Sequence, residues 1–392
     1  MTTRDITLHV EEPAVHSGFG YRGEVDGHEV TLLHDGEQCF PAMLDAIAHA
    51  ASEILLEMYW FGSDEIGRRF ADALSVRARE GVEVRVLYDA VGSIEASEDM
   101  FEGMRAAGVQ VVQYNPIAPW RRRFRFDSLT RRNHRKMLVV DKTIGFTGGV
   151  NIGDQWLPTA EGGEGWRDDM IMVRGPAVGA MRGIFMHGWH QMVSGRFIAY
   201  KGGQRRFPDE RTRINVLANH YFGARRAIRS TYLRRIRAAR ETVYVTNSYF
   251  VPDRRIRNAL ASAAARGVEV RVLVPGISDV QAVYYAGRKL YPWLHRRGIR
   301  VHEWLPQVLH AKTAVIDGEW CTVGTYNLDY LSWRTNLEVA IAIEDDDIAG
   351  ALHRRFLRDL DQSREIDHAY ITSRSFLERR LEDFFFMFRK FL

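Results

Sequence analysis

The 392-residue sequence predicts an α/β protein of two similar domains, each a mixed, mostly parallel β-sheet flanked by helices, packed with pseudo-twofold symmetry. Two observations predict this fold. First, residues 51–93 resemble residues 240–279, and both segments contain Gly-Val-Glu-Val-Arg-Val-Leu. Second, each copy runs from a strand-like apolar segment through helical apolar spacing into that second strand. The order strand, helix, strand favours a right-handed crossover between parallel strands.

Each copy continues with the same two elements. A helix that ends at Gly108 or Gly298 precedes a further strand, which we expect within 109–116 and 299–306. The repeat also sets the predicted domain boundaries. We expect a first domain at 1–194, a connecting region at 195–235, a second domain at 236–375 and an amphipathic C-terminal helix at 376–392.

The composition is that of an ordinary folded protein. Hydrophobic residues make up 46% of the chain and charged residues 27%, which excludes the disordered and low-complexity classes. The N-terminal segment lacks the basic start and apolar core of a signal peptide, and no run reaches the roughly 18 apolar residues that span a bilayer. The only two cysteines, Cys39 and Cys321, give no support for a zinc site and little for a disulfide. This cysteine content fits a protein of the reducing cytoplasm.

A motif frame at 134–151 recurs at 310–327. The matching residues are His134 and His310, Lys136 and Lys312, Asp141 and Asp317, Gly148 and Gly324, and Asn151 and Asn327. Residues two apart in a strand share a face, so each His and Lys should point the same way, as expected if both address an anion. Only six of the 54 basic residues are lysines, so two lysines at matching places indicate a need for a compact ammonium group.

Two histidines, one from each domain, can divide the cleavage of a phosphodiester between them. One attacks phosphorus and forms a phosphohistidine, while the other protonates the leaving oxygen and later deprotonates an incoming hydroxyl. We expect the phosphate oxygens to be bound by the two lysines and by residues of the turn that ends each frame, namely Asn151, Asn327, Gly149 and Thr325. This chemistry requires no metal and no cofactor.

Four acidic residues accompany the two frames. Asp168 and Glu338, each at the start of a strand-like run after the motif Asn, are expected to hold a histidine in one tautomer. The alternative for both is a surface acid at a strand edge. Asp141 and Asp317 complete the motif and are grouped with the catalytic residues, although their place at the end of a buried strand favours a role in turn geometry.

Two segments are candidates for lipid contact. The first copy carries additional residues before His134, in which arginines alternate with aromatic residues, and we expect an anionic surface to contact Trp120, Arg121, Arg122, Arg123 and Phe124. At the C-terminus, spacings of four and three connect Leu377, Leu381, Phe384, Phe388 and Phe391. This stripe predicts either an interfacial helix, with Phe384 and Phe388 in lipid, or a helix docked on the core.

The twin His-x-Lys frames, each followed by Asp and then by Gly and Asn, resemble the signature of the phospholipase D superfamily. The resemblance covers roughly residues 30–365 and is strongest to bacterial cardiolipin synthases of the short type without transmembrane helices, through YFVPD, PGISD, VLHAK and RDDMIMVRGPAV. It implies that a phosphatidyl group passes through a phosphatidyl-histidine from one phosphatidylglycerol to another, which yields cardiolipin and glycerol. It also implies that His134 is the nucleophile and His310 the acid and base.

The same resemblance implies where the protein works and with what. Its partners would be anionic phospholipid, phosphatidylglycerol above all, and the surface of the membrane. The protein would be peripheral, on the cytoplasmic side of the cell membrane. No metal or cofactor is implied.

Three alternatives to this function are open at the level of sequence. A phospholipase D that hydrolyses phospholipid to phosphatidic acid would use the same residues with water as the acceptor. A phosphodiesterase or nuclease could follow a nucleic-acid backbone with the arginine-rich segment. That class often has one motif per chain and dimerises, whereas two motifs predict an active site complete within one chain, so nucleic acid is disfavoured. An inactive binding module would need a broken motif, and both are intact.

Overall fold

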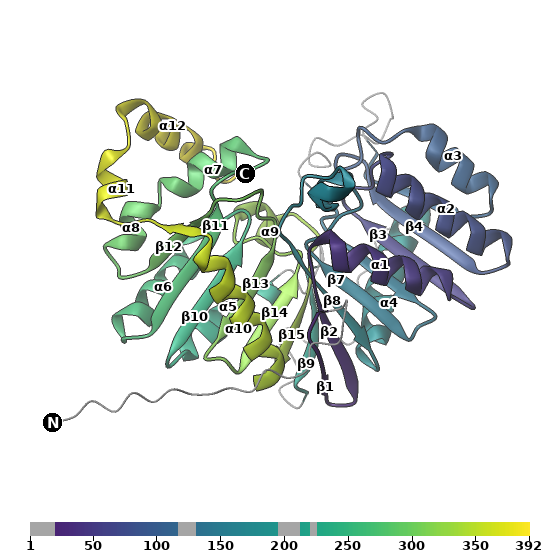
Figure 1. Ribbon diagram of the computed structural model, residues 1–392, viewed down its shortest axis with the longest axis horizontal. Helices are drawn as coiled ribbons and strands as arrows, with labels where there is room; N and C mark the ends of the chain where they lie inside the picture. Colours follow the sequence, from purple (N-terminus) through teal and green to yellow (C-terminus); the bar gives the residue numbers. More distant parts are fainter. Residues whose placement is uncertain (1–19, 117–130, 195–211, 220–225) are drawn as a thin grey trace.

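The computed structural model describes residues 20–116, 131–194, 212–219 and 226–392, and it shows two halves side by side (Figure 1). The first half contains, in chain order, β1 (Arg22–Val25), β2 (His28–His34), α1 (Asp35–Ala48), β3 (Glu53–Met58), α2 (Glu65–Arg79), β4 (Glu83–Asp89), α3 (Glu98–Ala106), β5 (Gln110–Tyr114), β6 (Met137–Val140), β7 (Ile144–Gly148), η2 (Asp154–Trp156), η3 (Thr159–Glu161), β8 (Asp169–Arg174) and α4 (Ala177–Ser194).

The second half repeats the plan. It contains β9 (Ile214–Ala218), α5 (Ala227–Ala238), β10 (Thr242–Asn247), α6 (Arg254–Ala265), β11 (Glu269–Pro275), α7 (Gln281–Arg288), α8 (Tyr291–His295), β12 (Arg300–Trp304), β13 (Lys312–Ile316), β14 (Trp320–Gly324), α9 (Tyr330–Arg334), β15 (Val339–Glu344), α10 (Asp346–Asp361), β16 (Ser363–Glu365), α11 (His368–Ser373) and α12 (Phe376–Met387).

Each half builds one mixed sheet, which has eight strands within the described residues. The strand order is β1-β2-β8-β7-β6-β3-β4-β5 in the first sheet and β16-β12-β11-β10-β13-β14-β15-β9 in the second. Helices cover the sheets, with α1, α2 and α3 sharing one hydrophobic cluster with the first. The predicted fold of two similar α/β domains is confirmed.

The predicted predominance of parallel pairing is wrong. The crossovers through α2 and α6 do make β3-β4-β5 and β10-β11-β12 parallel. All other pairs among the described strands are antiparallel, including β3-β6, β6-β7 and β7-β8. The reason is the length of the connections, because a tight turn such as that between β6 and β7 can only return the chain antiparallel, whereas a parallel neighbour needs a helix-length crossover.

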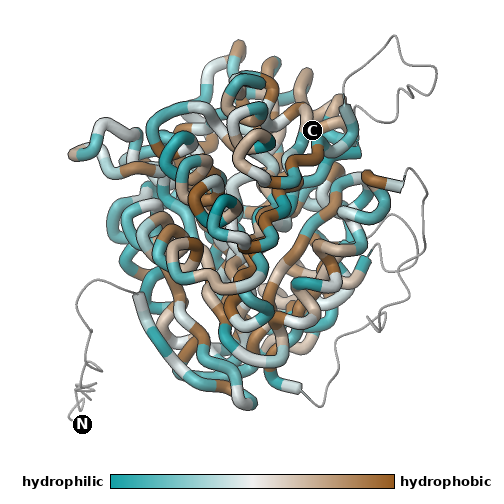
Figure 2. The backbone as a smooth tube through the Cα atoms, turned by 90° about the vertical axis from the view of Figure 1, so that its right-hand side faces the viewer, coloured by the Kyte–Doolittle hydropathy of each residue, from teal (hydrophilic) through white to brown (hydrophobic). Residues whose placement is uncertain are grey.

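The two halves share part of their hydrophobic core. One cluster contains Ile171 and Val173 of β8 together with Val323 of β14 and Ile341 of β15, all buried. The strands carry much of the brown, hydrophobic colour in Figure 2, while many turns at the surface are teal. Burying apolar area from both sheets in one cluster favours the joined arrangement over two separate domains.

Several expected regions lie partly or wholly outside the described residues. The arginine-rich residues from Trp120 to Phe124 lie wholly outside the described residues, so their contact with lipid stays a prediction. Of the expected connection at 195–235, the described part includes β9, which pairs with β15 in the second sheet. Among the helices that the structure describes, none is long and apolar enough to cross a bilayer.

Asp141 and Asp317 close the turns that follow β6 and β13. Both have left-handed backbones, with φ of 50° and 56°, which aspartate tolerates better than most residues. The Asp141 carboxylate accepts hydrogen bonds from the backbone N–H groups of residues 51–53 at 2.7 to 2.9 Å. Asp317 binds the N–H groups of residues 240–242 in the same way. Each carboxylate lies at the end of its strand remote from the motif histidine, which supports the structural role over the catalytic one.

We predict that Asp141→Ala lowers the free energy of unfolding by roughly 1 to 2 kcal/mol, because three backbone N–H groups lose an acceptor of the capping type. Partial burial raises the pKa of Asp141, but hydrogen bonds from Ala51, Glu53 and Ser52 lower that pKa by more, so that it lies below its ordinary value. The stabilisation is therefore present above about pH 4 and is lost as the pH falls through the folded-state pKa. Urea unfolding at neutral and acidic pH measures it. Lost activity at unchanged stability would contradict the structural role.

Candidate active site

The two motif histidines lie in short extended segments that pair with the opposite half. The segments before β6 and β13 form parallel bridges with the segments before β15 and β8 respectively. The His134 N–H donates to the Leu337 carbonyl at 3.0 Å, and the His310 N–H donates to the Arg167 carbonyl at 2.7 Å. Each histidine is therefore positioned by backbone of the other half, and the site forms only where the halves meet.

The predicted orienting acids are exchanged between the halves in the same way. Asp168, just before β8, has its Oδ2 at 2.8 Å from His310 Nδ1. Glu338, just before β15, lies 3.3 Å from His134 Nδ1. Each domain thus supplies a histidine to one pair and a carboxylate to the other. Because Nδ1 faces the carboxylate, Nε2 is the ring nitrogen left for chemistry.

Gly149 and Thr325, which we expected beside the phosphate, lie against the two carboxylates. A Cβ added to Gly149 would stand 2.0 Å from Asp168 Oδ1, so the close approach of the carboxylate requires glycine. At the matching position the Thr325 hydroxyl donates to Glu338. The cause is strand pairing, because β7 and β8 are antiparallel neighbours, as are β14 and β15. These contacts support a role in holding the acids in place of the expected phosphate contact.

Lys136 and Lys312 are buried in an arrangement that an anion would stabilise. They are 0% and 2% exposed, and each Nζ donates to the carbonyl of its own motif histidine, at 3.0 Å for Lys136. Burial and the charge of Lys312 lower the pKa of Lys136 to about 7, and burial lowers the pKa of Lys312 to about 8. Two buried lysines with lowered pKa values favour the binding of a negatively charged ligand, which would stabilise their charged forms.

The motif asparagines keep an amide nitrogen available for such a ligand. Asn151 Oδ1 accepts from the Trp60 N–H at 3.1 Å, and Asn327 Oδ1 accepts from the Ser248 hydroxyl at 2.9 Å. Both side chains are 2% exposed. With each oxygen used by the protein, the NH2 group is the part of the amide that can donate to a phosphate oxygen.

Aromatic rings around the histidines were missed by the sequence analysis. The Tyr59 ring lies 4.7 Å from the His134 ring and 5.0 Å from Lys136 Nζ. Trp156 and Tyr249 lie 5.3 and 6.3 Å from the His310 ring. A signal was present, because aromatic residues follow the first strand of each repeat, Tyr59 and Trp60 in the first and Tyr249 in the second.

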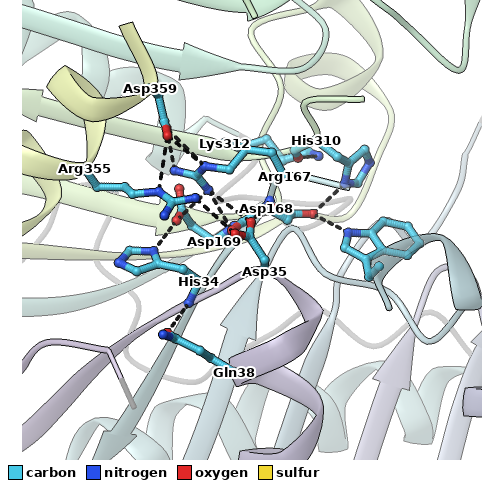
Figure 3. Close-up of polar contacts among 11 residues, drawn as sticks. His34, Asp35, Gln38, Arg167, Asp168, Asp169, His310, Lys312, Arg355 and Asp359 are labelled. Atoms are coloured by element: carbon cyan, nitrogen blue, oxygen red, sulfur yellow. Dashed lines mark hydrogen bonds and ion pairs between the residues drawn. The ribbon is translucent and has the colours of Figure 1, made fainter. Parts of the chain in front are cut away.

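A buried ion-pair network lies behind Asp168 and crosses between the halves (Figure 3). Its centre is Arg167, whose side chain is 2% exposed and contacts Asp169 at 2.8 Å and Asp359 of α10 at 2.7 Å. Arg167 also donates to the Asp168 carbonyl at 2.7 Å. The backbone of Asp168, whose carboxylate contacts His310, is therefore bonded to a charged contact between the two halves. The further members of the network are His34, Asp35 and Arg355.

The family model for "Cardiolipin synthase, PLD-like domain" matches residues 43–173 and 232–360. Each matched range contains one motif frame, and together they cover more than half of the chain. The chain belongs to this family. The resemblance that the twin frames indicated is thereby confirmed.

Individual relatives and a solved structure extend the comparison. The cardiolipin synthase of Geobacillus thermodenitrificans is 35% identical over 356 residues, which cover 90% of this chain and 70% of that protein. A probable cardiolipin synthase of Bacillus subtilis is 33% identical over 355 residues, covering 91% and 70%. The phosphatidylserine synthase of Haemophilus influenzae matches with a TM-score of 0.73 and 13% identity, over 93% of this chain and 95% of that chain, which concerns the fold alone.

In this member of the PLD-like family, both histidines are shifted toward the neutral form. Burial and then the charge of Lys136 lower the pKa of His134, against the opposing effect of Glu338. Burial and the charge of Lys312 hold the pKa of His310 well below its ordinary value. Burial also raises the pKa of Asp168 to about 6. Near pH 7 the site without ligand therefore presents two neutral imidazoles, one of which can attack while the other waits for a proton.

We predict that the alkaline decline of kcat/KM, which begins as His310 of the free enzyme loses its proton, steepens near pH 7 to 8, where Lys136 and Lys312 lose theirs. The acidic decline of kcat/KM should lie below the ordinary histidine pKa of about 6.5, because protonation of His134 removes the nucleophile and the pKa of His134 is lowered. The alkaline decline of kcat should come at higher pH, since a bound phosphodiester anion favours the charged lysines. Rates with a soluble short-chain phosphodiester measure both profiles. Coincident alkaline declines of kcat and kcat/KM would contradict the anion-binding role of the lysines.

Proposed function

We propose that this protein is a phosphatidyltransferase that converts two molecules of phosphatidylglycerol into cardiolipin and glycerol. The observation that carries the proposal is the reciprocal pair of histidines, each held by the other domain's carboxylate, beside two buried lysines. A site with twofold pseudosymmetry suits a reaction whose donor and acceptor are the same lipid. The identity of the relatives as cardiolipin synthases supports the choice of substrate.

In the first half-reaction, Nε2 of His134 attacks phosphorus of the donor phosphatidylglycerol. The phosphorus–nitrogen bond forms as the bond to the glycerol oxygen breaks, and protonated His310 gives its proton to that oxygen. The anionic phosphodiester favours this protonation, because its charge offsets the effect of Lys312 on the His310 pKa. Glycerol leaves, and a phosphatidyl group remains on His134.

The second half-reaction reverses the roles. A headgroup hydroxyl of a second phosphatidylglycerol loses its proton to His310 and attacks phosphorus, which breaks the phosphorus–nitrogen bond and releases cardiolipin. The charge on the phosphoryl oxygens is balanced by Lys136 and Lys312 and by the amide NH2 groups of Asn151 and Asn327. Protein groups thus supply the electrostatic stabilisation, and we propose that the reaction proceeds without a metal ion.

The proposed substrate also places the protein at a membrane. Phosphatidylglycerol is an anionic lipid of a bilayer, so we propose a peripheral enzyme on the cytoplasmic side of the cell membrane. Both motifs lie in one chain, and both pairs form within it. The active site is therefore complete in a single copy.

Purified protein incubated with phosphatidylglycerol vesicles in EDTA tests the proposal. Lipid mass spectrometry should show cardiolipin, and the aqueous phase an equal amount of glycerol. Formation of phosphatidic acid alone would identify a hydrolase, and product that appears only with added divalent cation would overturn metal independence. If neither lipid forms while plasmid DNA is nicked, the lipid function is wrong. The His134→Ala variant is the blank for contaminating activity.

A further inference from the structure

The C-terminal helix α12 turns its apolar side outward. Large hydrophobic residues that are 46% to 72% exposed gather there and just beyond it: Phe376, Leu377, Phe384, Met387, Phe388 and Phe391. At 3.6 residues per turn they fall on one side of the helical path, with Arg380 among them. They are six of the thirteen exposed large hydrophobic residues in the described parts of the chain. A gathered set of this size indicates a binding surface, whereas single exposed residues need no explanation.

The opposite side of α12 is the one that packs on the protein. Glu382 is 2% exposed, pairs with Arg374 at 2.7 Å and has Arg288 of α7 at 3.6 Å. Phe385 stacks on Tyr285 of α7, with ring centroids 5.9 Å apart. Figure 1 shows α12 beside α7 at the edge of the second half. The helix therefore docks on the core through the side that holds this buried ion pair and the Phe385 ring, and the apolar stripe stays exposed in the described part of the chain.

We propose that this outward side, which we call the α12 face and define as the six exposed hydrophobic residues and Arg380, binds the surface of an anionic phospholipid bilayer. The inference rests on the proposed function, which requires lipid substrates. An amphipathic helix lying in the plane of an interface buries its apolar side at the level of the headgroups and acyl chains. Here the protein holds the other side of the helix, so its orientation is set before binding.

Charge favours a bilayer over a second copy of the chain. Arg380 points outward with its side chain 63% exposed, and Arg379 and Lys390 are exposed nearby. Of the acids of the helix, Glu382 is buried on the inner side with Arg374. Asp383 is 37% exposed at the flank of the stripe, where it pairs with Lys289 and lies 3.7 Å from Arg380. Long basic side chains can reach from an apolar surface to headgroup phosphates. An isologous pairing of two α12 faces would instead bring like charges together.

The loop before α7, the helix on which the inner side of α12 packs, also carries exposed apolar residues. The loop before α7 exposes Ile277 by 50% and Val280 by 36%. Between them, Asp279 accepts a hydrogen bond from Tyr249 at 2.5 Å, and the Tyr249 ring lies 6.3 Å from the His310 ring. The loop adjoins the same helix on which the inner side of α12 packs. A bilayer that contacted both the α12 face and this loop would shorten the path of a lipid headgroup from the bilayer to the site.

Vesicle sedimentation of the full chain tests the inference. A variant with Leu377→Gln, Phe384→Gln and Phe388→Gln should bind phosphatidylglycerol vesicles at least about tenfold more weakly than wild type, because three apolar side chains no longer enter the interface. A control with Val76→Gln and Leu357→Gln, which alters exposed hydrophobic residues on α2 and α10, should bind as wild type does. Wild type should bind phosphatidylglycerol vesicles more tightly than phosphatidylcholine vesicles, and its binding to phosphatidylglycerol vesicles should weaken as salt is added. Equal melting temperatures show that each variant is folded.

A second measurement reads insertion directly. Both native cysteines are buried, so a Phe384→Cys variant can be labelled with an environment-sensitive fluorophore, whose emission should shift to the blue on vesicles. Unchanged emission would overturn the proposal, and so would full vesicle binding by the folded triple variant. A wild-type dimer that the triple variant fails to form would also overturn it, because the α12 face would then bind a second copy of the chain. The two proposals can fail separately. If wild type makes no cardiolipin but the triple variant loses vesicle binding, only the proposed function is refuted. If wild type makes cardiolipin and the triple variant binds vesicles as wild type does, only the role of the α12 face is refuted.

Discussion

His134→Ala is expected to lower phosphatidyl transfer by at least about 10³-fold, because the variant has no nitrogen with which to attack phosphorus. The side chain is 7% exposed and its Nδ1 is held at 3.3 Å from Glu338, so no other group of the first frame is positioned to replace it. His310→Ala should also lose transfer, since the leaving glycerol oxygen has no proton donor. Cardiolipin formation from phosphatidylglycerol measures both losses, and they do not by themselves distinguish the two roles.

A substrate with a p-nitrophenol leaving group separates nucleophile from acid. That leaving group departs without protonation, so His310→Ala should release about one equivalent of p-nitrophenol per enzyme in a burst and then stop. The phosphatidyl group should then be found on His134, as an adduct labile to acid and stable to base. The His134→Ala variant should show no burst. A burst in His134→Ala, with the adduct on His310, would reverse the assignment.

Arg167→Met is expected to lower the free energy of unfolding by about 3 to 5 kcal/mol, which is the usual cost of leaving a buried charge without its partner. The guanidinium lies 2.8 Å from Asp169 and 2.7 Å from Asp359, so its loss would leave two carboxylates in a buried region. Burial raises the pKa of Asp169, but Arg167, His34 and Arg355 together hold that pKa well below its ordinary value. Without Arg167 the pKa of Asp169 should rise. Denaturant unfolding at neutral pH measures the loss.

Two comparisons make this prediction specific. Arg68→Met removes an exposed partner of Glu65 and should cost less than about 1 kcal/mol. The double variant Arg167→Met with Asp359→Leu should lose less than the sum of the single losses, whereas additive losses would show that the pair is not coupled. Arg167 is also bonded to the Asp168 carbonyl. We therefore expect the surviving Arg167→Met enzyme to lose more kcat with a glycerol leaving group than with p-nitrophenol, which a purely structural role would not produce.

The architecture could be predicted from sequence because the chain repeats itself. Residues 51–93 and 240–279 each show the apolar periodicity of a strand, a helix and a second strand. The right-handed crossover rule predicts that the two strands of such a unit are parallel. The antiparallel remainder of each sheet was predicted less well. Its strands, such as β7 and β8, are short, and periodicity says where a strand lies but not which neighbour it will have.

The residues of the candidate site could be selected from the sequence by residue type and spacing. His134, Lys136 and Asn151 recur with fixed spacing, so their selection required no coordinates. The exchange of acids was not predictable, because Asp168 and His310 are separated by most of a domain and meet through pairing between halves. Gly149 was predicted beside the phosphate, and its contact with Asp168 was not predictable, since a carboxylate just before the neighbouring strand occupies the space that a Cβ would fill.

The sequence alone determined that the protein has two related α/β halves, two histidines with matched lysines, and an amphipathic C-terminal segment, because each of these is written in local spacing. Only the tertiary structure decided which acid contacts which histidine, how Arg167 joins the halves, and that α12 docks through Glu382 and Phe385. These features depend on contacts between residues far apart in the chain. Local periodicity carries no information about such contacts, which are selected when the two halves bury their shared surface.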